Sequence, residues 1–336
     1  MAAELIAVRG LRVAFASDAG LARVLDGVDV VMRPGEIRGL VGESGCGKTT
    51  LARAILGILP RGSARIEAGE IIFRGSDLLG LPEAVLAAEV RGRQIAYIPQ
   101  DPSTSFNPVF TIGTQIADLM RFKSPLQEQG LGARARRAAD RARVVEMLRL
   151  VQLPNPEAVL EKYPHEVSGG QRQRLMIAMA LLTEPRLVIA DEPTTALDVT
   201  VQAQILKLLK QLARDRGVAV LFTTHDLGAA WEICDRVTVM YAGQEVEGAP
   251  VAGFFDHPSH PYTQKLLESL PSASGEIRGI AGEIPRLIDP PPGCRFHPRC
   301  ERASPECRAA RPGVTMVGED HQVRCYHPLS AAERGV

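Results

Sequence analysis

One glycine-rich run limits what this chain can fold into more than any other feature of its sequence. Residues Gly42 to Thr49 read GESGCGKT, which fits the phosphate-loop pattern G-x-x-x-x-G-K-S/T. An apolar, strand-like stretch precedes the run, and Lys48 to Leu59 follows it with apolar residues at helical spacing. A glycine-rich turn that matches the pattern by chance is the alternative, and the strand and the helix on its two sides argue against it.

The loop predicts contacts with the phosphates of MgATP. Glycines allow backbone N–H groups to approach phosphate oxygens, and the N-terminus of the following helix adds positive potential. Lys48 can reach the β- and γ-phosphates, and the Thr49 hydroxyl can ligate Mg²⁺. The residues expected to bind the nucleotide here are Gly42, Glu43, Ser44, Gly45, Cys46, Gly47, Lys48, Thr49 and Thr50.

Two adjacent carboxylates end a second apolar stretch, which begins at Leu187. Asp191 is expected to hold Mg²⁺ through water, and Glu192 to act as the general base on the attacking water. Adjacent like charges repel each other, and a nearby cation offsets that repulsion. A metal–nucleotide site is therefore favoured over two solvated acids. The sequence therefore predicts hydrolysis of ATP as well as binding.

A further phosphate-binding surface is predicted at Ser168, Gly169, Gly170 and Gln171, where a helix begins. Serine is a favourable helix N-cap, and the two glycines expose backbone N–H groups at the positive end of the helix. One chain needs only one such surface for one ATP. The second surface therefore predicts a nucleotide site that is completed between two chains.

The segment Val167 to Gln171 resembles the LSGGQ signature of ABC-transporter ATPases. The other marks of that family follow in order, and the resemblance covers residues 4–250. It implies a P-loop NTPase core of the α/β class with an antiparallel β subdomain and an inserted helical subdomain at about residues 111–180. The alternation of strand-like and helix-like segments is consistent with a parallel α/β sheet.

The same resemblance implies four more site residues. Gln100 is expected to ligate Mg²⁺ and take part in catalysis, and His225 to contact the γ-phosphate. Asp198, at the end of the Ala196–Leu197–Asp198 segment, is expected to lie at the partner subunit. Phe15 is expected to stack on adenine, with a core aromatic as the alternative. The expected catalytic residues are Lys48, Gln100, Glu192 and His225, and the expected Mg²⁺ ligands are Thr49, Gln100 and Asp191.

The composition of the sequence changes near residue 255, where prolines become frequent. An ATPase domain is expected over residues 1–255 and an irregular, cysteine-rich extension over residues 256–336. Four of the six cysteines gather in that extension: Cys294, Cys300, Cys307 and Cys325. Because structural disulfides are rare in the cytosol, this clustering indicates a metal site.

The extension resembles that of the oligopeptide and dipeptide importer ATPases, on the runs GCRFHPRC from Gly293 and HPYTQKLL from His260. YPHEVSGG from Tyr163 and DEPTTALDVT from Asp191 carry the same resemblance. It implies that the four cysteines hold a 4Fe–4S cluster. A Cys₄ zinc site and free thiols are the alternatives, and a Cys₃His site could use one of the nearby histidines: His297, His321 and His327.

The family resemblance implies an energy-coupling subunit of a multi-subunit importer with peptides as cargo. Nickel, glutathione, opines or oligosaccharides are alternative cargoes, and a soluble ATPase on DNA or ribosomes or an iron–sulfur redox protein are less favoured functions. The implied partners are a second, paralogous ATPase subunit, two transmembrane permease subunits and, indirectly, an extracytoplasmic substrate-binding protein. No nucleic acid is expected, because 39 basic residues balance 39 acidic ones.

The expected location is the cytoplasmic face of the bacterial inner membrane, where the permease subunits would hold the chain. The first six residues do not read as a basic and apolar leader. The longest apolar runs have the length of a strand, far below the roughly 20 residues that a bilayer requires.

Overall fold

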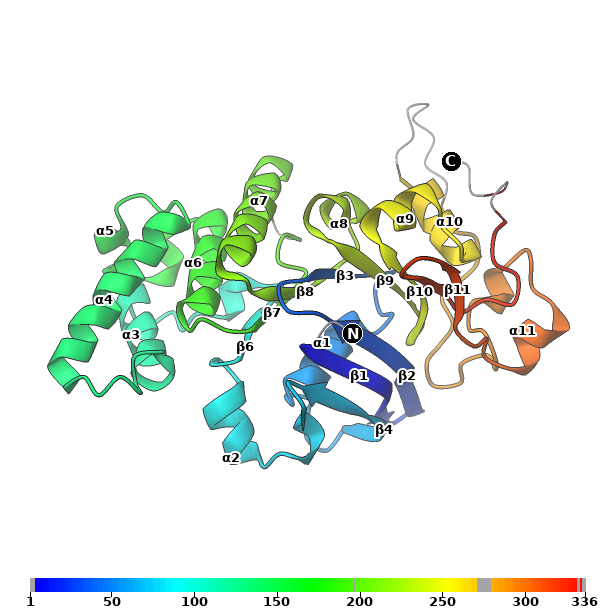
Figure 1. Ribbon diagram of the computed structural model, residues 1–336, viewed down its shortest axis with the longest axis horizontal. Helices are drawn as coiled ribbons and strands as arrows, with labels where there is room; N and C mark the ends of the chain where they lie inside the picture. Colours follow the sequence, from blue (N-terminus) through cyan, green and yellow to red (C-terminus); the bar gives the residue numbers. More distant parts are fainter. Residues whose placement is uncertain (1–3, 196, 271–278, 331–332, 334–336) are drawn as a thin grey trace. The chain divides into compact units, whose positions relative to one another are not determined.

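The chain is divided between two structural units in the computed structural model, which describes residues 4–195, 197–270, 279–330 and 333 (Figure 1). The first unit joins residues 1–80 to residues 223–336, and the second is formed by residues 81–222. The expected boundary near residue 255 falls within helix α9 (Val251–Asp256) and stays a prediction.

The first unit contains a four-stranded antiparallel sheet in the order β2-β1-β4-β5. Its strands are β1 (Ile6–Ser17), β2 (Gly20–Met32), β4 (Ala64–Phe73) and β5 (Ser76–Asp77). Val13 at the middle of β1 pairs with Leu25 on one side and with Ile66 on the other. Both Val13 and Leu25 are buried, so this face of the sheet forms core. The expected antiparallel β subdomain is confirmed.

A second set of strands in this unit carries the phosphate loop. Strand β3 (Ile37–Val41) pairs in parallel with β9 (Arg236–Tyr241), and β9 pairs antiparallel with β10 (Gln244–Pro250). All five residues of β3 are buried, as expected for an interior strand of a parallel sheet. The helices of the unit up to residue 256 are α1 (Lys48–Ile55), α8 (Leu227–Ile233) and α9, and a short 3₁₀ turn is η1 (Leu78–Gly80).

The C-terminal extension belongs to the first unit and is less irregular than the sequence predicts. Helix α10 (Pro261–Glu268) starts it, and a hairpin of β11 (Thr315–Gly318) and β12 (His321–Val323) follows later. β12 pairs with β10, so the hairpin extends the strands of the ATPase domain. The remaining elements are the 3₁₀ turn η5 (His297–Arg299) and α11 (Pro305–Ala309).

The second unit places a helical group beside two parallel strands, β6 (Ile95–Ile98) and β7 (Leu187–Asp191). Helix α6 contacts β6 and also packs against three other helices of the unit, α3, α4 and α7. The helices are α2 (Glu83–Val85), α3 (Ile112–Lys123), α4 (Ala133–Leu150), α5 (Pro156–Leu160), α6 (Gly169–Leu182) and α7 (Val199–Arg216). Short turns are η2 (Leu86–Val90), η3 (Pro102–Thr104) and η4 (Pro164–Glu166), and β8 (Ala219–Thr224) runs across the unit boundary.

The helical insertion expected at about residues 111–180 corresponds to α3 through α6. In the part of the chain that the structure describes, no helix is both long and apolar enough to cross a membrane.

Candidate functional site

The phosphate loop connects the end of β3 to the first turn of α1, as the sequence predicts. Two of its glycines sit where no side chain fits. Gly42 has φ 152°, and a Cβ there would lie 2.2 Å from the carbonyl oxygen of Met240. Gly47 has φ 110°, and a Cβ there would lie 2.8 Å from Leu25 Cδ2. These two glycines therefore fix the loop's shape, while Ser44 and Gly45 are exposed at its tip.

Lys48 is buried at the base of this loop. Its ammonium donates to the carbonyl oxygen of Gly42 at 2.8 Å and to that of Glu43 at 3.4 Å. No side chain caps the start of α1, where Gly47 is the N-cap. Thr49 and Thr50 follow on the first turn and are half-buried. A cationic group and a helix N-terminus thus converge on the loop, which is the arrangement that binds phosphate anions.

Glu43 has partners that the sequence did not predict. Its backbone N–H donates to the hydroxyl of Tyr262 at 3.0 Å. Its carboxylate accepts hydrogen bonds from both terminal nitrogens of Arg299, at 2.9 and 3.3 Å. Cys46, also in the loop, is 2% exposed, and burial raises the pKa of its thiol.

The two carboxylates at the end of β7 are each hydrogen-bonded within the second unit. The Tyr97 hydroxyl donates to Asp191 Oδ2 at 3.0 Å. The Gln100 amide donates to Glu192 Oε2 at 3.1 Å, and the Thr195 hydroxyl donates to the same oxygen at 3.2 Å. The structure thus brings the expected base and the expected glutamine together.

The backbone of Glu192 is strained. Its φ is 47°, a left-handed conformation that non-glycine residues adopt rarely, and such residues concentrate at functional sites. Asp191 is 1% exposed, and Glu192 is half-buried.

Ser168 caps α6, so the expected N-cap is confirmed. Its hydroxyl accepts the backbone N–H of Gln171 at 3.3 Å, and the Gln171 side chain accepts the backbone N–H of Ser168 at 3.0 Å. A Cβ on Gly169 would meet no heavy atom within 4 Å, whereas one on Gly170 would lie 3.0 Å from Val201 Cγ1. The helix start is therefore capped, and it is accessible at Gly169.

The other expected residues lie in three different places. Phe15 is half-buried near the end of β1, paired with Ala22 and Ala64. His225 is exposed between β8 and α8. Asp198 caps α7 by accepting the N–H of Val201 at 2.9 Å, while Ala196 lies outside the described residues.

The four clustered cysteines line one small cavity in the extension. None of the four forms a disulfide in the part of the chain that the structure describes. Burial and the neighbouring thiols raise the pKa of Cys294 to about 11 and that of Cys325 to about 12. His260 and His327 line the same cavity, and the Nε2 atom of each is buried without a hydrogen-bond partner among the described residues. Within those residues, no group of three or more His, Cys, Asp or Glu side chains is arranged to hold a metal ion.

Comparisons with known proteins decide the family. Residues 25–195 match the profile of the ABC transporter family, and residues 246–307 match that of the oligopeptide/dipeptide transporter C-terminal region. The chain belongs to the ABC transporter family. It is accordingly an ATP-hydrolysing protein.

Relatives align with nearly the whole chain. The probable peptide ABC transporter ATP-binding protein y4tR of Sinorhizobium fredii is 46% identical over 96% of this chain and 94% of its own length. The dipeptide transport ATP-binding protein DppD of Bacillus subtilis is 42% identical over 99% of this chain and 97% of its own. The dimeric structure of MJ0796, a bacterial ABC transporter cassette, is 25% identical with a TM-score of 0.62, over 73% of this chain and 98% of that one.

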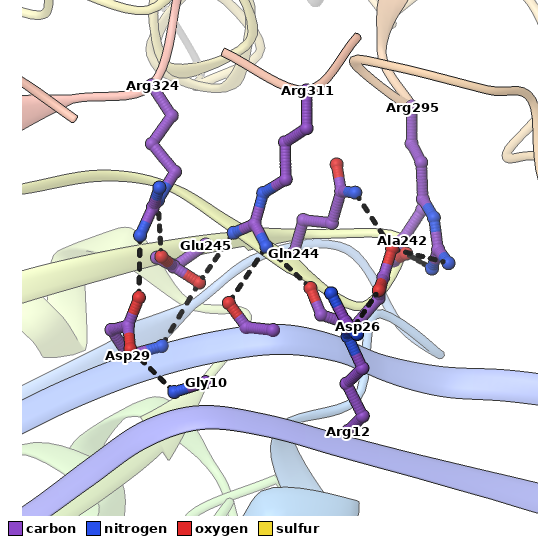
Figure 2. Close-up of polar contacts among 11 residues, drawn as sticks. Gly10, Arg12, Asp26, Asp29, Ala242, Gln244, Glu245, Arg295, Arg311 and Arg324 are labelled. Carbon is purple, nitrogen blue, oxygen red and sulfur yellow. Dashed lines mark hydrogen bonds and ion pairs between the residues drawn. The ribbon is translucent and has the colours of Figure 1, made fainter. Parts of the chain in front are cut away.

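Arginines beside the cysteines attach the extension of this ABC ATPase to its own first unit (Figure 2). Arg295 reaches Asp26 of β2 at 3.1 Å, and Arg311 reaches Glu245 of β10 at 3.0 Å. Arg324 bridges Glu245 and Asp29, the latter at 2.6 Å. Burial raises the pKa of Glu245, against the opposing effect of the two arginines. Figure 2 shows the three arginines descending side by side onto these carboxylates.

Arg299 and Tyr262 are neighbours of the phosphate loop that the sequence motifs do not predict. Both lie in runs that carried the family resemblance, GCRFHPRC and HPYTQKLL. Those runs indicated a metal site and a subfamily, and nothing in their spacing points to a residue more than 200 positions away.

Proposed function

We propose that this ABC ATPase powers the import of dipeptides or oligopeptides from the cytoplasmic face of the bacterial inner membrane. The observation that carries the proposal is similarity over nearly the full chain, extension included, to proteins named for peptide and dipeptide transport. The match of residues 246–307 to the oligopeptide/dipeptide C-terminal region supports it independently of the ATPase motifs.

Within the nucleotide site, the phosphate loop binds ATP and Lys48 neutralises the β- and γ-phosphates. Thr49, Gln100 and Asp191 would hold Mg²⁺, which would neutralise charge on the phosphates, and Glu192 is the proposed base that activates water. The burial of Lys48 against loop carbonyls and the hydrogen bonds on Asp191 and Glu192 support these roles, because catalytic groups must be held in place before the substrate arrives.

Three further residues complete the proposed site. His225 contacts the γ-phosphate, and its exposure at the end of β8 leaves the imidazole accessible. Phe15 stacks on adenine, for which its half-buried ring at a strand end is suited. Asp198 faces the partner subunit while it caps α7.

The signature residues Ser168, Gly169, Gly170 and Gln171 act on the ATP of a second ATPase subunit, a paralogue of this chain. The capped and accessible start of α6 supports this assignment. The similar cassette MJ0796 is described as dimeric.

Two permease subunits dock on the segment from Gln100 to Phe110, and a substrate-binding protein delivers the cargo to them. Val109 and Phe110 support this docking surface, since their exposed fractions are 69% and 50%. Exposed large apolar side chains beside a catalytic loop are typical of a protein interface.

Replacing Lys48 by alanine should weaken binding of MgATP about 10- to 100-fold, because a charged hydrogen-bond donor to the phosphates is lost. Arg53→Ala, which removes an exposed cation from the same helix, should leave the affinity unchanged. Titration of the full-length chain with a fluorescent ATP analogue measures both. Equal affinities for the two variants would contradict the assignment of the loop.

The cargo is tested by reconstituting the chain with its two permease subunits and the substrate-binding protein in proteoliposomes. Dipeptides and oligopeptides should stimulate ATP hydrolysis and accumulate inside the vesicles. Stimulation by nickel, glutathione, an opine or an oligosaccharide instead would contradict peptide transport and leave the ATPase assignment intact.

The cysteine cavity is the proposed site of a 4Fe–4S cluster, held by Cys294, Cys300, Cys307 and Cys325. The chemistry of the lining supports the proposal, because four thiols and two unpartnered imidazole nitrogens, on His260 and His327, surround one cavity, although the described side chains are not arranged as metal ligands. When bound, the cluster would supply a structural crosslink between four chain segments.

Anaerobically purified protein should contain about four irons and four acid-labile sulfides per chain. Cys307→Ser should lower the iron content and the sulfide content. Cys234 is a buried cysteine elsewhere in the unit, and Cys234→Ser should leave both contents unchanged. One zinc per chain, without sulfide, would contradict the cluster in favour of the Cys₄ alternative.

A further inference from the structure

The phosphate loop is held from outside the motif by two residues of the C-terminal extension. Tyr262 on α10 accepts the backbone N–H of Glu43 at 3.0 Å, and Arg299 at the end of η5 clamps the Glu43 carboxylate at 2.9 and 3.3 Å. The side chain of Arg299 is 3% exposed and that of Glu43 is 24% exposed. A buried, two-pronged arginine–carboxylate pair fixes geometry more strongly than a surface ion pair does.

Arg299 is itself anchored independently of Glu43. Its Nε donates to the carbonyl oxygen of Ala281 at 3.0 Å, and its Nη2 donates to that of Ile280 at 3.0 Å. Its Nη1 also reaches the Tyr241 hydroxyl at 3.3 Å, and the guanidinium lies 5.7 Å from the centre of the Tyr241 ring. The guanidinium therefore has a defined position, from which it holds the Glu43 carboxylate.

The backbone of Arg299 lies between two residues of the cysteine site. Arg299 lies in a turn that starts at Cys294 and ends at Cys300, two of the four cysteines on the cavity. The backbone N–H of His297 donates to the Cys294 carbonyl at 2.9 Å, and that of Arg299 donates to the Phe296 carbonyl at 2.9 Å. The Phe296 ring is fully buried, with ring centres 5.1 Å from Tyr241 and 5.3 Å from Tyr262.

We propose that Arg299 is a positioning residue of the nucleotide site. It fixes Glu43 and with it the two carbonyl groups, of Gly42 and Glu43, on which the Lys48 ammonium rests. Because the turn that carries Arg299 is bounded by Cys294 and Cys300, the affinity of the loop for MgATP depends on the integrity of the cysteine site. This inference rests on the proposed role of the phosphate loop in binding ATP.

A purely structural role for Arg299 makes a different prediction, and Arg311 provides the matched control. Both arginines attach the extension to the first unit through a carboxylate, Glu43 for Arg299 and Glu245 for Arg311. Only Arg299 touches the phosphate loop. If attachment alone matters, the two alanine variants will change nucleotide binding alike.

The test compares Arg299→Ala, Arg299→Lys and Arg311→Ala in the full-length chain, with a fluorescent ATP analogue and Mg²⁺. Arg299→Ala should raise Kd and KM for MgATP about tenfold, and Arg299→Lys, which keeps the charge without the planar fork, should raise them less. Turnover at saturating MgATP should stay within about twofold of wild type, since Arg299 touches no reacting atom. Arg311→Ala should lower the unfolding temperature and leave Kd unchanged.

Two more variants, Glu43→Gln and Cys300→Ser, test the same contact if Arg299→Ala fails to fold. Glu43→Gln removes the charge on the loop side and should raise Kd several-fold with the extension intact. Cys300→Ser should raise Kd in the same direction, and it should add nothing in the Arg299→Lys background if both act through one path. Unchanged Kd in Arg299→Lys and Glu43→Gln, or equal changes in Arg299→Ala and Arg311→Ala, would overturn the inference. If Lys48→Ala binds MgATP normally, the role of the loop itself fails instead.

Discussion

Replacing Glu192 by glutamine should lower ATP hydrolysis by at least about 100-fold and leave binding of MgATP within about twofold of wild type. The amide keeps the size of the carboxylate and can still interact with Gln100 and Thr195, which hydrogen-bond to Oε2 of Glu192 in the structure. It cannot accept a proton from water at neutral pH. The loss therefore falls on the chemical step rather than on the binding step.

Glu184 offers a matched control for this experiment. It is also a glutamate with positive φ, 52°, and follows the end of α6 in the same unit. Its exposed carboxylate pairs with Arg143 at 2.6 Å. Glu184→Gln should leave both hydrolysis and binding unchanged. Phosphate release under single-turnover conditions is the measurement, and retention of wild-type hydrolysis in Glu192→Gln would remove the general-base role.

The parts of the fold that the sequence predicted are those with uninterrupted local patterns. The apolar stretch that begins at Leu187 and ends in two carboxylates is strand β7, and the helix predicted to start at Lys48 is α1. Each is bounded by polar or turn-forming residues and depends little on distant partners. Such elements carry enough information within their own few residues.

Strand β10 was missed for the opposite reason. Its sequence from Gln244 includes Glu245 and Glu247, and although glutamates are mostly exposed in proteins, both are buried here. Their carboxylates contact residues 66 or more positions away, among them Arg311, Arg324 and His321. A burial that depends on remote partners leaves no periodic signal near the strand itself.

The candidate site shows the same difference between local patterns and long-range contacts. The motifs predicted which residues to consider, because each motif is local and its chemistry restricts the residue types. They could not predict that Gln100 donates to Glu192, that Tyr97 donates to Asp191 or that Arg299 clamps Glu43. These contacts are set by tertiary packing, which is also why the proline-rich tail proved to contain α10 and the hairpin of β11 and β12.

Glu247→Ala should destabilise the first unit by about 3–5 kcal/mol, the cost typical of removing one partner from a buried charged network. The Glu247 side chain is 0% exposed. It accepts the backbone N–H groups of Ser259 and His260, each at 2.8 Å, and contacts His321 Nε2 at 2.7 Å. The alanine variant leaves all three groups buried and without this acceptor.

The three partners of Glu247 lie at the start of the extension and on its hairpin, so the carboxylate ties both ends of the extension to β10. Chemical denaturation measures the loss, with Glu268→Ala, an exposed position on α10, expected within about 0.5 kcal/mol of wild type. A loss below about 1 kcal/mol in Glu247→Ala would mean that the extension is only loosely attached. The larger loss would mean that the extension contributes to the stability of the first unit through its contacts with β10.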